Sequence, residues 1–179
     1  MADTKITDLT ALTGANVATT DPLVIVDVSD TTMAPSGTTK KIASSELAIG
    51  LGISNSFLGF GASGVSSTTT TRYLWPWYED SLAQTSAIQM RVPRACTLKN
   101  MRVRHNTTAG NGNNIVYTVR KNGTATALTV TLASTASDGS DTTNTVSFAA
   151  GDLIDIEVTK ASSIGTSPSN ITVTIEAGV

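Results

Sequence analysis

Apolar and polar residues alternate along several short runs beyond Arg72, and this period of two restricts the fold more than any other feature of the chain. In one run, Met101 and Val103 alternate with Arg102 and Arg104. Such a run predicts a strand that buries one face and exposes the other. Eight runs of this kind are separated by turn residues, and the predicted strands are Arg72–Tyr78, Ala87–Val92, Thr97–His105, Ile115–Lys121, Ala127–Leu132, Thr145–Phe148, Leu153–Lys160 and Ile171–Glu176.

Composition and turns favour the same all-β fold. Threonine occupies 31 of the 179 positions, and β-branched side chains suit the pleated surface of a sheet. Asn122-Gly123 predicts a tight hairpin because both residues tolerate a positive φ, and Ala150–Asp152 marks another turn. Short antiparallel strands at this density fit a sandwich of the jelly-roll type. We therefore predict that residues 72–179 form an eight-stranded antiparallel β-sandwich, which we call the head domain.

Residues 1–53 carry only short signals of order. Leu23–Val28 predicts a strand, and Ser44–Leu47 predicts the start of a short helix. So few apolar residues cannot offset the entropy of ordering this segment, which is about 1–2 kcal/mol per residue. We expect an extended arm that attaches to another protein through ten apolar side chains: Ile6, Leu9, Leu12, Leu23, Val24, Ile25, Val26, Val28, Ile42 and Leu47.

Residues 54–71 are rich in glycine in their first half and in serine and threonine in their second half. This composition is typical of flexible connectors. We predict a linker at 54–71, between the arm at 1–53 and the head domain at 72–179.

The charge balance argues against a nucleic-acid partner. Twelve Lys and Arg residues against fourteen Asp and Glu residues give a net charge of −2 and a pI near 5.2. No overall positive field exists to collect phosphates. The chain also lacks a signal-peptide pattern and any run of the roughly 18 apolar residues that span a bilayer. We expect neither a nucleic-acid nor a membrane partner.

Residues that suit catalysis are few. His105 is the only histidine, which excludes a multi-histidine metal site within one chain. Asp155 and Glu157 share a strand face about 6–7 Å apart, within the range of glycosidase pairs, but any polar strand face has this spacing. Asp138–Asp141 suits a calcium ion, yet turn chemistry explains it better. The single cysteine, Cys96, is expected to be a small buried hydrophobe. We predict a protein that is not an enzyme and has no cofactor and no metal.

Four aromatic residues lie close together in the first predicted strand: Tyr73, Trp75, Trp77 and Tyr78. The period of two puts Tyr73, Trp75 and Trp77 on one face, and Pro76 favours a sheet edge because proline cannot donate to a ladder. The cluster suits a subunit interface, the closed end of a core, or a platform on which sugars stack.

Arg102 and Arg104 suit ion pairs across subunits or, equally, an ordinary solvated strand face. Together with the aromatic cluster they form the predicted oligomer interface: Tyr73, Trp75, Trp77, Tyr78, Arg102 and Arg104.

Two groups of segments resemble parts of tailed-bacteriophage virion proteins. The first looks like the attachment module of phage fibre and head-decoration proteins and consists of Met1–Gly14, Asp21–Asp30, Thr38–Ile42 and Glu46-Leu47. The second is similar to small jelly-roll head domains of phage particles, which commonly trimerise, and consists of Val92–Ala95, Arg102–Arg104, Val119–Gly123 and Ala149–Leu153.

This resemblance implies a virion protein that is made in the cytoplasm of a bacterial host. One interpretation is a capsid decoration or cement protein, a homotrimer whose arms dock on the major capsid protein and stabilise the phage head. The alternative is a short tail fibre, whose arm attaches to a tail or baseplate protein and whose sandwich binds host surface glycans. Neither family pattern supplies catalytic residues.

Overall fold

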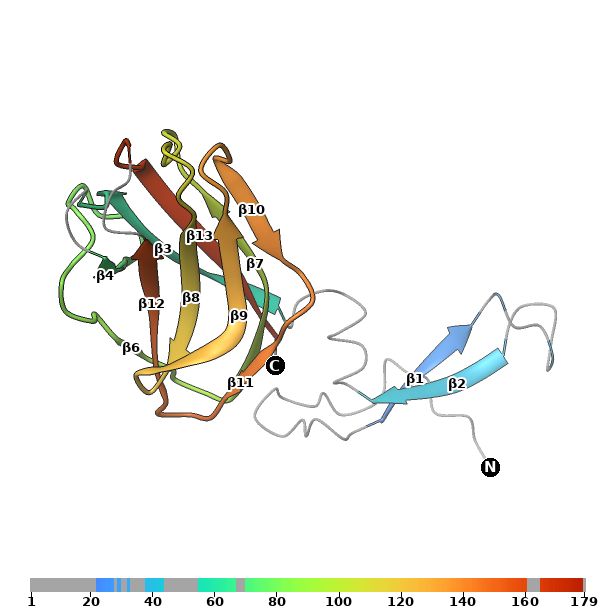
Figure 1. Cartoon of the computed structure of the whole chain (residues 1–179). Coiled ribbons are helices and arrows are strands. Elements are labelled where there is room, and N and C mark those ends of the chain that lie inside the picture. Colours follow the sequence, from blue (N-terminus) through green and yellow to red (C-terminus); the bar gives the residue numbers. More distant parts are fainter. Residues whose placement is uncertain are drawn as a thin grey trace, which may run out of the picture. The chain divides into compact units, whose positions relative to one another are not determined.

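Figure 1 shows the computed structural model, which describes residues 22–27, 29, 32, 38–43, 55–66, 70–160 and 165–178. The chain divides into two compact units, Met1–Ser54 and Asn55–Val179. All regular secondary structure among the described residues is β-strand, and all named strands pair in antiparallel fashion. The prediction of an all-β fold is therefore confirmed for this part of the chain.

In the first unit, β1 (Pro22–Asp27) pairs with β2 (Thr38–Ala43), and Leu23 lies opposite Ile42. β1 covers most of the strand predicted at Leu23–Val28. The predicted short helix lies outside the described residues, and so do five of the ten predicted attachment residues: Ile6, Leu9, Leu12, Val28 and Leu47.

The second unit consists of two sheets that stand face to face as a sandwich (Figure 1). One sheet has the order β10-β7-β13-β3-β5, with β11 also on β7, and we call it the β13 sheet. The other has the order β4-β12-β8-β9, with β6 also on β12, and we call it the β12 sheet. The strands are β3 (Asn55–Gly64), β4 (Thr71–Tyr73), β5 (Trp75–Pro76), β6 (Met90–Arg91), β7 (Cys96–Arg104), β8 (Ile115–Lys121), β9 (Thr124–Leu132), β10 (Asp138–Asp141), β11 (Val146–Phe148), β12 (Leu153–Lys160) and β13 (Ser169–Gly178).

The partners of these strands are nested along the chain. β8 and β9 form the innermost hairpin, and β7 pairs with β10 and β11 outside it. β4 and β6 pair with β12, and β3 pairs with β13 as the outermost pair. The Asn122-Gly123 turn that closes the innermost hairpin has φ values of 52° and 81°, as the sequence predicts.

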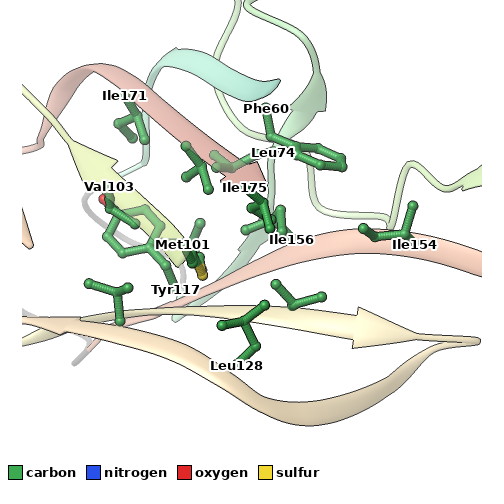
Figure 2. Close-up of a cluster of buried hydrophobic side chains, with 14 of the residues drawn as sticks. Phe60, Leu74, Met101, Val103, Tyr117, Leu128, Ile154, Ile156, Ile171 and Ile175 are labelled. Atoms are coloured by element: carbon green, nitrogen blue, oxygen red, sulfur yellow. The ribbon is translucent and has the colours of Figure 1, made fainter. Parts of the chain in front are cut away.

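The apolar residues of the alternating strands meet between the two sheets. Figure 2 shows this cluster, in which Ile156 of β12, Ile175 of β13 and Leu128 of β9 are fully buried. Burying a side chain of this size stabilises a fold by about 1.5–3 kcal/mol. The alternation read from the sequence thus forms the core, and its polar partners form the two outer faces of the sandwich.

The predicted linker at 54–71 is wrong over its first half, because residues 55–64 form the long strand β3. Phe60, Ala62 and Val65 are buried, and β3 pairs with β13 along its whole length. The glycines of this segment are packing positions rather than hinges. A Cβ on Gly61 would lie 2.7 Å from the carbonyl oxygen of Ile171, so that only glycine fits there.

Other strand limits also differ from the prediction. β8 and β12 match the predicted ranges, whereas the strand predicted at Ala87–Val92 is reduced to the two residues of β6. The segment Asp138–Asp141, predicted as a turn, is strand β10 on the edge of the β13 sheet. Its Asp-Gly-Ser-Asp sequence carries no strand signal, and only the pairing with β7 makes it a strand.

Candidate functional site: the outer face of the β13 sheet

The register of the β13 sheet sets out its outer face as rows of aligned residues. In one row Arg104 of β7 lies opposite Thr172 of β13, which lies opposite Gly61 of β3. In the next row Arg102 lies opposite Thr174, which lies opposite Gly59. Because the buried core residues alternate with these positions, the rows face away from the core. We call this surface the outer face.

A third row continues the outer face towards the start of β3. Lys99 lies opposite Glu176, and Glu176 lies opposite Phe57. The carboxylate of Glu176 accepts a hydrogen bond from Asn100 Nδ2 at 2.6 Å and pairs with Lys99 Nζ at 3.2 Å. These contacts, with Asn100 the larger, lower the pKa of Glu176. The charged groups of the third row are therefore partnered within the domain.

Exposed aromatic and apolar side chains run along β3, and we call them the aromatic strip. They are the four large hydrophobic residues that remain exposed among the described residues: Phe57 at 69%, Trp77 at 58%, Tyr78 at 49% and Leu82 at 55%. Soluble proteins seldom leave such side chains grouped in water, so the aromatic strip is a candidate contact surface.

The glycines of β3 shape the aromatic strip. A Cβ on Gly59 would contact the Trp77 ring at 3.5 Å, and a Cβ on Gly61 would contact the Tyr78 ring at 3.1 Å. The Tyr78 hydroxyl donates a hydrogen bond to Asn170 Oδ1 at 3.1 Å, so that the tyrosine ring spans from β3 to β13. Because Gly59 and Gly61 have no side chains, the rings of Trp77 and Tyr78 pack directly against the backbone of β3.

Trp77 adopts an unusual backbone conformation for a bulky residue, with a φ of 64°. Its amide donates to the carbonyl of Gly59 at 2.7 Å, which fixes this conformation. Such a residue costs about 1–3 kcal/mol and tends to occur where function requires it. The strain does not serve the core, because the Trp77 ring remains largely exposed.

The other side of the outer face carries two arginines, with Asp138 of β10 opposite Arg104. Arg102 and Arg104 are exposed, and neither makes a hydrogen bond or an ion pair with any described residue. A shallow hollow of about 260 Å³ borders both arginines, and another of about 510 Å³ borders Arg102. Arg102 lies two strand spacings, about 10 Å, from Gly59. The outer face therefore carries an aromatic side and a cationic side, separated by threonines.

The six predicted interface residues do not lie together. Trp77, Tyr78, Arg102 and Arg104 lie on the outer face, as described above. The prediction that Tyr73, Trp75 and Trp77 share a face is wrong, because the chain changes sheets at Leu74. The amide of Leu74 donates to Ile156 of the β12 sheet, whereas Trp75 lies opposite Gly61 of the β13 sheet. Alternation along one strand does not hold where the chain leaves one sheet for the other.

Trp75 is partly buried against the core, and its indole NH donates to the carbonyl of Leu82 at 3.2 Å. The sequence reasoning missed Phe57 and Leu82. The signal for Phe57 was present, since Leu58, Phe60 and Ala62 alternate with glycines in the segment taken as a linker.

Tyr73 belongs to a charged cluster on the β12 sheet. The Arg120 guanidinium lies 5.0 Å from the centre of the Tyr73 ring, and its Nη1 contacts Glu157 Oε2 at 3.1 Å. Its Nε lies 3.5 Å from Asp155 Oδ1, and Gln89 donates to the other oxygen of Asp155 at 2.9 Å. Burial raises the pKa of Asp155, and its partners only partly oppose this.

The carboxylates of Asp155 and Glu157 thus share one guanidinium as their partner, and the charges of this cluster are paired within the fold. The sole histidine, His105, is buried without a hydrogen bond on either ring nitrogen among the described residues, and burial lowers its pKa.

Asp141 also has a structural role. Burial favours its neutral form, but hydrogen bonds from Asn144, Thr129 and Thr143 outweigh this and lower its pKa to about 2. Its carboxylate fixes the turn after β10. Across the described residues, no group of three or more metal-ligating side chains forms, and no helix has the length and apolar character to cross a membrane.

No protein-family model matches the chain, and no curated protein matches it.

Proposed function

We propose that this protein is a non-enzymatic structural component of a tailed-phage particle, a capsid decoration protein that works as a homo-oligomer. The observation that carries the proposal is the outer face, where Trp77 and Tyr78 are exposed and where Arg102 and Arg104 have no partner among the described residues. Interfaces are enriched in Trp, Tyr and Arg, and those residues supply most of their binding energy.

The strand pairing supports a jelly-roll head domain. If β4 and β6 count as one interrupted strand, β10 and β11 as another, and the two-residue edge strand β5 is left out, the remaining eight strands pair first with last, second with seventh, third with sixth and fourth with fifth. A long hairpin rolled into two sheets has this order, which is that of a jelly roll. The fold is common to many functions, so it supports the resemblance without deciding it.

The two sides of the outer face suit a closed ring of subunits. In a homotrimer each subunit would place its aromatic strip against Arg102 and Arg104 of the next, an arrangement that a rotation of 120° closes. Arginine over an aromatic ring gains about 0.5–2 kcal/mol, more when water is excluded. Such a contact also gives the two arginines partners that they lack among the described residues of one subunit.

The N-terminal unit supplies the attachment in this proposal. Its hairpin contains the apolar run Leu23–Val26, and a two-stranded hairpin alone is marginal in water. Docking on the major capsid protein would bury this run, and three arms on one trimer would raise each other's effective concentration. The proposed location is the head surface of the virion, after synthesis in the bacterial cytoplasm.

Three measurements test the proposal. Sedimentation velocity of the full chain should give an oligomer across the micromolar range, and a monomer would contradict the homo-oligomer. Counting copies by quantitative gel of purified particles should give hundreds per particle for a capsid protein. A few to some tens would favour a tail location instead. In the same particles Val26→Asp should reduce incorporation far more than Thr69→Asp, because it puts a carboxylate into the apolar run.

The alternative is a short tail fibre that recognises host surface glycans. The observation that favours it is the exposure of the Trp77 and Tyr78 rings beside the amide of Asn170, since sugars stack on aromatic faces and hydrogen-bond to such groups. A monomeric chain whose binding to cell-surface glycans is lost in Trp77→Ser would favour this function over the first.

A further inference from the structure

An apolar pocket of about 170 Å³ opens between the two sheets, at the end of the sandwich where β3 begins and β13 ends. Its wall consists of Leu58, Met90, Val92, Cys96, Ile154 and Ala177. Leu58 and Ala177 come from the β13 sheet, whereas Met90 and Ile154 come from the β12 sheet. In Figure 2 Ile154 lies at one end of the buried cluster and Ile171 at the other. The pocket is therefore a gap at one end of the core.

The size of this gap matches a small ring or a short acyl chain. An engineered apolar cavity of about 150 Å³ stays dry and binds benzene. The side chains of Leu58, Met90 and Cys96 pack against the core but remain partly exposed, so that a molecule entering from solvent reaches them. Filling the gap would remove this apolar surface from water, which favours binding of an apolar group.

The rim of the pocket is cationic. Arg91 donates from Nη1 to the carbonyl of Gly151 at 2.9 Å, which holds its guanidinium in place. Arg94 makes no hydrogen bond or ion pair with any described residue, and it acts on the Cys96 thiol by lowering a pKa that burial raises. No Asp or Glu lines the pocket. An anion at the rim therefore finds a guanidinium without a competing carboxylate.

We propose that this pocket binds a small apolar carboxylic acid, with its ring or chain between the sheets and its carboxylate on Arg94. The shape and the charge of the pocket each select one part of this ligand: the apolar wall takes the hydrocarbon, and the rim takes the anion. The proposal does not depend on the virion function, because the pocket lies on the side of β3 opposite to the aromatic strip.

The test uses the full chain with benzoate and its neutral analogue benzyl alcohol as probes, followed by methyl NMR. Benzoate should shift the methyl signals of Ile154 and Met90 and leave Ile171 unchanged. It should also bind more tightly than benzyl alcohol. Arg94→Gln should weaken benzoate about fivefold without changing benzyl alcohol, as expected for a partly exposed charge pair. Lys99→Gln, which removes a cation that pairs with Glu176 on the outer face and does not line the pocket, should change neither.

A second variant tests the cavity itself. Ala177→Leu adds methyl groups where the gap is, so it should abolish binding of both probes while the protein keeps or raises its melting temperature. Absence of any shift at Ile154 with millimolar benzoate in the wild type overturns the proposal, including the case in which part of another copy already occupies the pocket. Equal benzoate binding by Arg94→Gln and the wild type overturns the assignment of a carboxylic acid.

Discussion

The two outer faces of the sandwich both carry arginine and aromatic side chains, but these side chains have different contacts on the two faces. On the β12 sheet Arg120 contacts Asp155, Glu157 and the ring of Tyr73, so that its charge and the neighbouring aromatic ring are satisfied within the subunit. On the β13 sheet Arg102 has no such partner among the described residues, and the Trp77 ring remains exposed. Residue type alone does not distinguish a cluster that is paired within the subunit from a candidate binding surface. The presence or absence of partners does.

The largest effect should come from removing the strand on which the aromatic strip lies. We expect residues 55–179 to melt cooperatively and residues 72–179 to fail to fold, because the shorter chain lacks β3 and leaves β13 without its main partner. The loss includes Phe60, and replacing such a buried residue by alanine alone costs about 3–5 kcal/mol. Circular dichroism melting of both fragments decides this. Cooperative melting of 72–179 would show that β3 is dispensable for the fold.

A matched pair of arginine substitutions tests the contrast between the two faces. Arg120→Met leaves the buried Asp155 without its cation and should lower the free energy of unfolding by about 3 kcal/mol. The double variant Arg102→Gln and Arg104→Gln should change it by less than about 0.5 kcal/mol, yet dissociate the oligomer. Denaturant unfolding and sedimentation velocity measure the two quantities. Equal stability losses in the two proteins would remove the distinction.

The pH dependence of stability separates two buried carboxylates. Asp141 has a pKa of about 2 in the fold against an ordinary 3.8, so its stabilising contribution is complete above about pH 4 and is lost as the pH falls towards 2. Asp141→Asn should lower stability at pH 7 by about 2 kcal/mol and flatten this acid limb.

Asp155 provides the opposite case for the same measurement. Its pKa is raised, so the folded state holds its proton more tightly and its contribution to stability decreases as the pH rises through that pKa. Asp155→Asn should therefore remove a contribution to the pH dependence of stability whose sign is opposite to that of Asp141. Acid limbs that are identical in the wild type and both variants would contradict these assignments.

A further small effect on stability is expected at Trp77. Trp77→Ser and Trp77→Gly should both abolish association, because each removes the exposed ring from the aromatic strip. Glycine adopts a positive φ without strain, so Trp77→Gly should be more stable than Trp77→Ser by about 1 kcal/mol. Thermal melting and sedimentation velocity measure both effects. A stability loss of about 3 kcal/mol or more in both variants would instead assign Trp77 to the core.

The sequence by itself determined the fold class and much of the strand pattern. The alternation of Ile154, Ile156 and Val158 with polar residues fixed both the limits of β12 and the face that it buries, because a period of two leaves only one way to hide the apolar side chains. A second local signal, the tolerance of Asn and Gly for a positive φ, identified the turn at Asn122-Gly123. Where one short segment contains its own signal, the prediction and the structure agree.

Only the tertiary structure decided which residues meet across the sandwich. The glycines of β3 resemble those of a linker in sequence. Only when β3 pairs with β13 do they form the surface against which Trp77 and Tyr78 pack. The chain crosses from one sheet to the other at Leu74. Tyr73 and Trp77 therefore lie on different sheets, although they are only four positions apart in the sequence. Strand pairing depends on contacts between distant segments, and local periodicity contains no information about which distant strand becomes the partner.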